Sequence, residues 1–423
     1  MHVLIFPSCN EPGLEVIDAL SCHPRIEVWG GSSFDLLSDP SRLLLGERHH
    51  ELPALSSAGF RGEMRKFCKD HSIDFVFPTV DAVVAEMSDW TESFKLIGPS
   101  HELAELVLSK ARVYDAVRDV VQVPRTFNPK SMELPAFAKP EIGSGSLGAV
   151  RLDDLASIET AVAAGLLVQE YLPGDEFTVD CISGVDGRLL ACSVRQRLNY
   201  GGGIAKAATC LEHLEIERHV QAIAERLPLA GPWFAQFRED GEGTPRLLEV
   251  NARVGGSSGV TRLAGINIPL MAVLAFSGLE IDSPRRMAST TITRRLDLNG
   301  DVDDFDWVVW DLDDTLVHAG EVVDPKMVAW LYRFNQAGKL QSLVTRNVDP
   351  RTVISRTRLP DFFDHIVSTT DKLAAIRALL SEQGASGERV IMINDSGAEK
   401  ILFKRELPAI RTIAPDAINV LRS

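Results

Sequence analysis

Two carboxylates stand two residues apart directly after an apolar run in the C-terminal third of the sequence. Asp311 and Asp313 follow the apolar residues 307–310, and Thr315 completes a DxDxT pattern. An aspartate in this place can attack a phosphoryl group, and a second one can act as general acid and then as general base. A solvated acidic loop is the plain alternative, but this order of residues favours phosphoryl transfer.

Further polar side chains that suit the same chemistry lie downstream. The apolar residues 342–344 end at Thr345, whose hydroxyl can hold a phosphoryl oxygen, and Lys372 can balance the charge of the nucleophile and the phosphate. Asp395 ends another apolar run, and Glu399 follows it. Carboxylate oxygens suit Mg²⁺. The predicted metal ligands of this part are Asp311, Asp313 and Asp395.

A lysine followed by a loop of small residues is the first chemical feature of the N-terminal part. Lys139 ends a strand-like run, and Gly143 to Gly148 follow. Glycines let backbone N–H groups approach phosphate oxygens, and the lysine adds a positive charge. The lysine precedes the glycines, so this is not a Walker loop; an ordinary turn explains these residues equally well. The predicted phosphate-binding loop residues are Ser144, Gly145 and Ser146.

A strand–turn–strand pattern follows at residues 168–180. The backbone just after Glu170 can hydrogen-bond an adenine edge, and Glu176 can accept hydrogen bonds from ribose hydroxyls. A plain hairpin with surface carboxylates is the alternative.

Three polar residues then alternate along one predicted strand. Glu249, Asn251 and Arg253 are expected to share a face, while Leu248 and Val250 face the core. Burying such a row without a ligand is costly. Hard oxygen donors suit Mg²⁺, and Arg253 would neutralise a transferring γ-phosphoryl group. A structural ion-pair strand is the alternative.

In this order, residues 139–148, 169–180 and 247–253 closely resemble the ATP-grasp superfamily, nearest to its carbamoyl-phosphate-synthetase-like and amino-acid-ligase-like members. The resemblance covers roughly residues 1–290. It implies that ATP and Mg²⁺, with Mn²⁺ as an alternative metal, are used to phosphorylate a carboxylate, from which an amine or thiol displaces phosphate. It implies ATP phosphate contacts from Lys110 and Lys139, adenine and ribose contacts from Glu170, Leu172 and Glu176, and metal ligation by Gln236, Glu249 and Asn251.

Asp311, Asp313, Thr345, Lys372 and Asp395, in this order, resemble the HAD phosphohydrolase family over residues 305–415. A Rossmann-like domain with incidental acids is the alternative. The short interval between the first two motifs leaves little room for a cap, so the resemblance implies an open site. Two residues depart from the family pattern, since Asn394 and Glu399 replace a glycine and an aspartate often seen there.

These residues must be positioned by alternating strands and helices. Strands are predicted at residues 2–6, 25–29 and 73–78, with helical runs after the first and the third, which indicates a parallel α/β sheet. Turn-rich connections from residue 136 onward indicate an antiparallel sheet, with a cationic loop at residues 195–203 that could close over an acyl phosphate. Strands at residues 307–310, 340–344 and 389–393 indicate a second, smaller parallel unit.

The predicted fold class is therefore α/β and α+β. The first resemblance implies an ATP-grasp ligase at residues 1–298, divided into a Rossmann-like part at 1–98 and an ATP-binding part at 99–298 with antiparallel sheets that clamp the ATP. The second implies a small Rossmann-like HAD domain with a minimal cap at residues 305–423. The expected partners are small-molecule carboxylate and amine substrates and a phosphorylated metabolite, and a homodimer is an open assembly state.

Composition limits the remaining function classes. A net charge of −15 argues against a broad nucleic-acid contact. The six cysteines include no CxxC pair, and the N-terminus lacks a basic region before its short apolar run, so we expect a cytoplasmic protein without membrane spans. Two alternatives stay open: an ATP-grasp kinase or carbamoyl-phosphate-like synthase, and a nucleotide-responsive binding protein whose HAD half senses phosphate.

Overall fold

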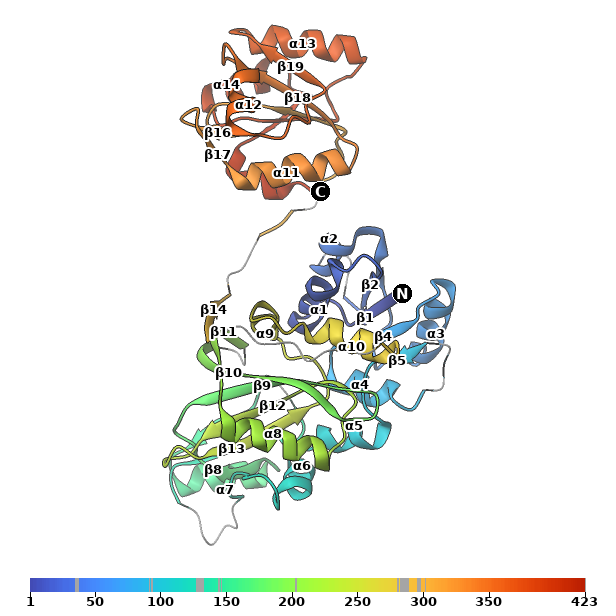
Figure 1. Cartoon of the computed structure of the whole chain (residues 1–423), viewed down its shortest axis with the longest axis vertical. Helices are drawn as coiled ribbons and strands as arrows, with labels where there is room; N and C mark the ends of the chain where they lie inside the picture. Colours follow the sequence, from blue (N-terminus) through green and yellow to red (C-terminus); the bar gives the residue numbers. More distant parts are fainter. Residues whose placement is uncertain are drawn as a thin grey trace. The chain divides into compact units, whose positions relative to one another are not determined.

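The computed structural model describes residues 1–34, 38–90, 92, 94–126, 133–143, 145, 147–201, 204–279, 281, 289–294, 298–300 and 302–422. The chain divides into two compact units, Met1–Arg295 and Leu296–Ser423 (Figure 1). The sequence placed the linker near residue 300. Each unit is described below by itself.

The first unit begins with a five-stranded parallel sheet of order β3-β2-β1-β4-β5. Val3 and Ile5 of β1 pack on α1, whereas Leu4 and Phe6 pack on α3 and α4, so both faces of the sheet are covered. A strand buried on both faces is built mainly of apolar residues, which explains the apolar run Val3–Phe6 in β1. The elements are β1 (His2–Phe6), α1 (Glu11–Ser21), β2 (Glu27–Ser32), α2 (Ser41–Leu45), β3 (His49–Glu51), α3 (Phe60–Asp70), β4 (Phe75–Pro78), α4 (Asp81–Met87) and β5 (Lys95–Leu96), with a 3-10 turn at Gly46–Arg48.

Two helices follow this sheet, α5 (His101–Leu108) and α6 (Lys110–Val117). The break is at Ser109, whose extended backbone and side chain cap α6 by accepting a hydrogen bond from the Arg112 N–H. Lys110 is therefore fixed at the first position of α6.

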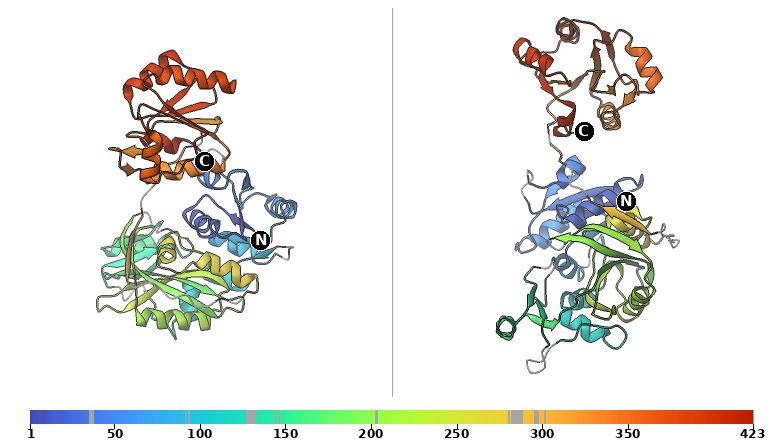
Figure 2. Two further views of the ribbon diagram at one scale, coloured as in Figure 1. Left: turned by 45° about the horizontal axis from the view of Figure 1, so that its top comes forward. Right: turned by 90° about the vertical axis from the view of Figure 1, so that its left-hand side faces the viewer.

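Two antiparallel sheets follow, as the sequence predicts. A three-stranded sheet has the order β7-β6-β8, and a six-stranded sheet has the order β13-β12-β9-β10-β11-β14. Helix α10 packs against α1 on one side and against β9 and β12 on the other, which joins this part to the first sheet (Figures 1 and 2). The elements are β6 (Ala136–Lys139), β7 (Val150–Leu152), α7 (Leu155–Ala163), β8 (Leu167–Glu170), β9 (Glu176–Ser183), β10 (Leu189–Gly201), β11 (Ile204–Leu211), α8 (Leu214–Arg226), β12 (Gly231–Glu239), β13 (Pro245–Asn251), α9 (Gly259–Leu263), α10 (Ile268–Phe276) and β14 (Thr290–Thr293).

The prediction of a cationic loop at residues 195–203 is wrong for residues 195–201, because strand β10 runs to Gly201. Arg195 is 1% exposed and donates hydrogen bonds to Asp180 of the neighbouring strand at 2.7 and 3.1 Å. A carboxylate on the adjacent strand thus lets an arginine occupy a buried strand position. Residues 202 and 203 of the predicted loop lie outside the described residues.

The second unit is a parallel five-stranded sheet of order β19-β18-β15-β20-β21. Val308 and Trp310 of β15 pack with α11 and α12, whereas Trp307 and Val309 pack with α13 and α14, giving three layers (Figure 2). The elements are β15 (Trp307–Trp310), the hairpin β16 (Val317–His318) and β17 (Val322–Val323), α11 (Pro325–Gln336), β18 (Leu340–Thr345), α12 (Pro350–Thr357), β19 (His365–Ser368), α13 (Lys372–Gln383), β20 (Val390–Ile393), α14 (Gly397–Glu406), β21 (Arg411–Ile413) and a 3-10 turn at Pro415–Val420.

All six cysteines are free of disulfides. Within the described ranges, the helices are too short or too polar to cross a bilayer.

Candidate functional site

A cavity of about 320 Å³ opens between the three-stranded and the six-stranded antiparallel sheets of the first unit. Strands β6 and β8 form one wall, and strands β9, β10, β12 and β13 form the other. The predicted nucleotide-site residues that line it are Lys110, Lys139, Gly145, Glu170, Leu172, Glu176, Gln236 and Glu249. We name this cavity the inner pocket.

Lys139, the last residue of β6, lies deep in the inner pocket and is 7% exposed. Its Nζ donates to the Tyr114 hydroxyl at 2.9 Å and to the Leu248 carbonyl at 3.0 Å. Burial lowers the pKa of Lys139 to about 7; the charge of Lys110 acts in the same direction and that of Glu249 opposes it. An anionic ligand would relieve this destabilised charge.

The Leu248 carbonyl is available to Lys139 because β13 carries a β-bulge. Gln236 pairs with Glu249, but Phe237 pairs with Leu247, so Leu248 is the extra residue. The predicted alternation is therefore wrong at Leu248, which lines the inner pocket instead of facing the core.

The bulge directs Glu249 into the cavity beside Gln236. Lys110 lies 3.5 Å from Glu249 Oε2 and donates to the Gly143 carbonyl at 2.7 Å, so it connects the small-residue loop to the carboxylate. Gln236 and Glu249 present hard oxygen donors side by side, a set that fits Mg²⁺.

The predicted adenine and ribose carboxylates are both engaged in ion pairs. Glu170 accepts from the Arg125 N–H at 2.9 Å and from Arg125 Nε at 2.6 Å. Glu176 is hydrogen-bonded by Arg197 and lies 3.5 Å from Arg238. Leu172 is 4% exposed and adds an apolar surface to the inner pocket.

A second cavity of about 250 Å³, which we name the outer pocket, shares four lining residues with the inner one: Gly145, Arg197, Gln236 and Glu249. Its other wall comes from the loops after β1 and β4, where the order of the parallel sheet reverses and ligands are usually bound. Arg253 lines this pocket, and its Nε donates to Asp81 at 2.7 Å. Arg253 also lies over the Phe234 ring, 5.3 Å from its centroid.

The remaining predicted residues of the first unit do not all reach these cavities. Asn251 lines neither pocket and is 8% exposed, and its Nδ2 finds no hydrogen-bond partner among the residues that the structure describes. Ser144 and Ser146 lie outside the described residues. Sequence reasoning missed Tyr114, and it placed Arg197 in a loop instead of on strand β10. The helical spacing that places Tyr114 one turn after Lys110 was a usable signal for the first.

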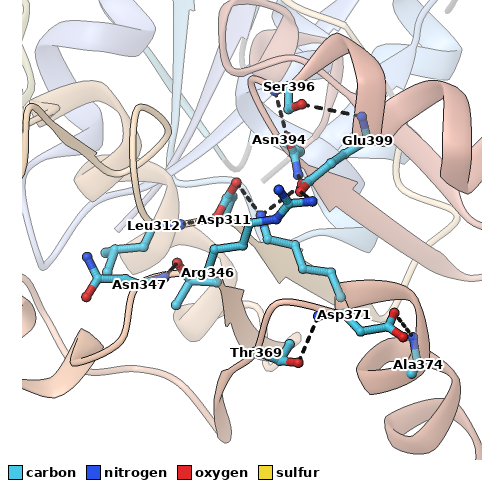
Figure 3. A network of polar contacts seen from close by, with 12 residues as sticks. Asp311, Leu312, Arg346, Asn347, Thr369, Asp371, Ala374, Asn394, Ser396 and Glu399 are labelled. Atoms are coloured by element: carbon cyan, nitrogen blue, oxygen red, sulfur yellow. Dashed lines mark hydrogen bonds and ion pairs between the residues drawn. The ribbon is translucent and has the colours of Figure 1, made fainter.

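In the second unit, Asp311 follows β15, the central strand at which the sheet order reverses. It is 6% exposed; its Oδ2 accepts from Lys372 Nζ at 2.6 Å and its Oδ1 from the Leu312 N–H at 2.8 Å (Figure 3). Burial raises the pKa of Asp311, against the opposing effect of Lys372. Asp371 caps α13 by accepting from the Ala374 N–H at 3.0 Å, and so holds Lys372 at the helix start.

Asn347 links Thr345 and Asp313 by donating a hydrogen bond to each. The Asn347 N–H donates to Thr345 Oγ1 at 3.1 Å, and its Nδ2 donates to Asp313 Oδ1 at 3.1 Å. Thr345 is the last residue of β18, the neighbour of β15, so both residues belong to the same sheet edge as Asp311.

Glu399 joins this site from α14. Its Oε2 accepts from Lys372 at 2.9 Å and from Asn394 Nδ2 at 2.7 Å, and its Oε1 lies 2.8 Å from Arg346 Nη2 (Figure 3). Burial raises the pKa of Glu399, but these hydrogen bonds and charges outweigh it and lower the pKa overall. Sequence reasoning missed Arg346 and Asn347.

Asp395 is exposed after β20. Among the residues that the structure describes, no three His, Cys, Asp or Glu side chains are grouped closely enough to hold a metal ion. Metal ligation by Asp311, Asp313 and Asp395 stays a prediction, as do the ligand contacts of the first unit.

Comparisons with known proteins concern the fold of the first unit. Residues 163–297 match the family model described as ATP-grasp in the biosynthetic pathway with Ter operon. The biotin carboxylase domain of Hydrogenobacter thermophilus 2-oxoglutarate carboxylase, solved with MgADP, ADP and bicarbonate, superposes with a TM-score of 0.57 and 14% identity, covering 69% of this chain and 73% of that one.

Two other solved structures are similar. The L-amino acid ligase of Bacillus licheniformis has a TM-score of 0.51 and 20% identity, covering 67% of this chain and 74% of that one. The Staphylococcus aureus N5-carboxyaminoimidazole synthetase, complexed with ADP, has a TM-score of 0.56 and 12% identity, covering 70% of this chain and 82% of that one. No curated protein matches the sequence. The first unit thus has the fold of the ATP-grasp superfamily.

Proposed function

We propose that the first unit is an ATP- and Mg²⁺-dependent carboxylate–amine ligase that works through an acyl phosphate. The observation that carries this proposal is the convergence of Lys110, Lys139, Gln236 and Glu249 on one cavity that opens into a second. The ATP-grasp fold supports it, as do the ADP and magnesium named with similar structures.

In this proposal the inner pocket binds ATP, with Lys110 and Lys139 on its phosphates. The carboxylate substrate enters the outer pocket, where the shared residues Gln236 and Glu249 bring it beside the terminal phosphate. A carboxylate oxygen attacks the γ-phosphorus and ADP leaves; the amine then attacks the acyl carbon, loses a proton, and phosphate leaves. Arg253 supplies positive charge in the outer pocket.

Gln236 and Glu249 would hold the magnesium ion. When bound, it would neutralise phosphate charge. Lys110 Nζ, 3.5 Å from Glu249 Oε2, offsets the negative charge of this carboxylate.

The test is an incubation of the full chain with ATP, Mg²⁺ and pairs of candidate carboxylates and amines, including amino acids. ADP and phosphate should appear together with a condensed product of the expected mass. ADP release with a phosphorylated product instead indicates a kinase. Absence of both nucleotide binding and ADP release across the panel would refute the ligase proposal.

We propose further that the second unit is an aspartate-nucleophile phosphatase of the HAD type, acting on a phosphorylated metabolite. The observation that carries this is the buried pair of Asp311 and Lys372 at the switch point of a parallel sheet, beside Thr345 and Asp313.

The chemistry would proceed in two steps. Asp311 attacks phosphorus while Asp313 donates a proton to the leaving oxygen. The alcohol departs and Asp311 carries the phosphoryl group as an aspartyl phosphate. Asp313 then takes a proton from water, the water oxygen attacks phosphorus, and phosphate leaves with Asp311 restored. Lys372 orients Asp311 throughout.

Phosphate release from a panel of phosphomonoesters tests this second proposal. Asp311→Asn should abolish release while Asp361→Asn, at an acid outside the site, leaves it unchanged. Equal activity of Asp311→Asn and the unaltered chain would refute the nucleophile assignment.

A further inference from the structure

Arg346 is a cation that the chemistry proposed above does not use. It directly follows Thr345 at the end of β18, and its side chain is 61% exposed. Its Nη2 nevertheless lies 2.8 Å from Oε1 of Glu399, whose side chain is only 9% exposed. Figure 3 shows Arg346 among the polar residues around Asp311 and Glu399. An exposed guanidinium thus reaches into the candidate phosphatase site.

Glu399 does not depend on Arg346 for its hydrogen bonds. Its other oxygen, Oε2, accepts from Lys372 at 2.9 Å and from Asn394 at 2.7 Å. The cap of α14 does not need the Glu399 carboxylate either, because Ser396 Oγ accepts from the backbone N–H of Glu399 at 3.3 Å. If Arg346 left, Glu399 would keep Lys372 as its cationic partner.

Lys372, by contrast, is committed to the site. It is 5% exposed and lies between Asp311 at 2.6 Å and Glu399 at 2.9 Å, so two carboxylates already share its charge. An incoming phosphoryl dianion adds negative charge that Lys372 alone does not balance. Of the two cations in this network, Arg346 is the one that solvent and ligand reach.

We propose that Arg346 is a phosphate-recognising residue of the second unit, whose guanidinium leaves Glu399 Oε1 to bind the non-bridging oxygens of a phosphomonoester. The planar fork of N–H donors suits such oxygens, and it forms charge-assisted, paired hydrogen bonds. In the free protein, Glu399 holds Arg346 over the site as an internal substitute for the substrate anion. This inference rests on the proposed phosphatase function.

The test uses the full chain with para-nitrophenyl phosphate as substrate and inorganic phosphate as competitive inhibitor. Arg346→Gln should raise both KM and the inhibition constant of phosphate about tenfold, as expected for a lost hydrogen bond between charged groups, with kcat changed less than about threefold. Arg346→Lys should restore part of the affinity. Arg351→Gln, at an exposed arginine of α12 outside the network, is the matched control and should change neither constant.

The outcomes separate the two proposals. Unchanged KM and inhibition constant in Arg346→Gln, with hydrolysis intact in the unaltered chain, overturn the role of Arg346 and leave the phosphatase proposal standing. A selective fall in kcat also overturns it, because it assigns Arg346 to the chemical step instead of substrate recognition. No hydrolysis and no phosphate binding by the unaltered chain overturn both. Equal thermal unfolding midpoints of the variants and the unaltered chain verify that folding is intact.

Discussion

Raising the pH from 7 to 9 is expected to weaken ADP binding through one side chain, Lys139. This lysine is buried in the inner pocket, and its pKa is about 7 instead of the usual 10.5. Only the protonated lysine attracts the phosphates, so binding raises its pKa. The affinity is therefore fully present below pH 7 and is lost as the pH rises through the pKa of the free protein.

The magnitude follows from that pKa. If the bound phosphates return Lys139 to an ordinary pKa, ADP affinity falls about fiftyfold between pH 7 and pH 9, or ~2.3 kcal/mol. At pH 8, binding should take up roughly 0.9 proton. The nucleotide phosphates are largely ionised over this range, so they contribute little to the slope.

Isothermal titration of Mg²⁺-ADP into the full chain, in buffers of different ionisation enthalpy, measures both quantities. Lys139→Met should remove the slope and the proton uptake, whereas Lys206→Met, at an exposed lysine of β11, should retain them. A pH-independent dissociation constant in the unaltered chain, or an unchanged slope in Lys139→Met, would show that Lys139 does not titrate on ADP binding.

Three further perturbations have expected results. Glu249→Gln should raise the Mg²⁺ concentration needed for half-maximal ADP release at least about tenfold, because one charged oxygen ligand is lost; an unchanged Mg²⁺ titration contradicts this. Arg195→Met should lower the free energy of unfolding by about 3–5 kcal/mol in denaturant titrations, because it leaves Asp180 buried without its cation; a cost under about 1 kcal/mol would mean that Asp180 finds another partner. Asp313→Asn should slow hydrolysis of an alkyl phosphate by about 10²–10⁴-fold but that of para-nitrophenyl phosphate less, because the better leaving group needs less proton donation; equal losses would contradict the general-acid role.

Uniform apolar runs made much of the fold predictable. Two examples are β1 (residues 2–6) and β15 (residues 307–310). A central parallel strand is covered on both faces, so it is built mainly of apolar side chains and stands out in the sequence. Functional groups follow such strands in parallel sheets, which is why Asp311 and Thr345 could be placed at one sheet edge.

Features set by contacts between distant segments could not be predicted. The bulge at Leu248 depends on how β13 pairs with β12, so the period-two alternation of the sequence misplaces Leu248. Arg195 looked like a loop residue because its partner Asp180 lies on another strand. Arg346 has no local signal, since Glu399 is brought to it only by the folded sheet.

The proposed ligase chemistry requires a metal-bound triphosphate between Lys139 and the Gln236–Glu249 pair. A crystal structure of the full chain with Mg²⁺ and a non-hydrolysable ATP analogue tests this most directly. Density for the phosphates beside Lys110 and Lys139, with the metal on Glu249 and Gln236, is the predicted result. Nucleotide density elsewhere on the chain, with the inner pocket empty at saturating analogue, would contradict it.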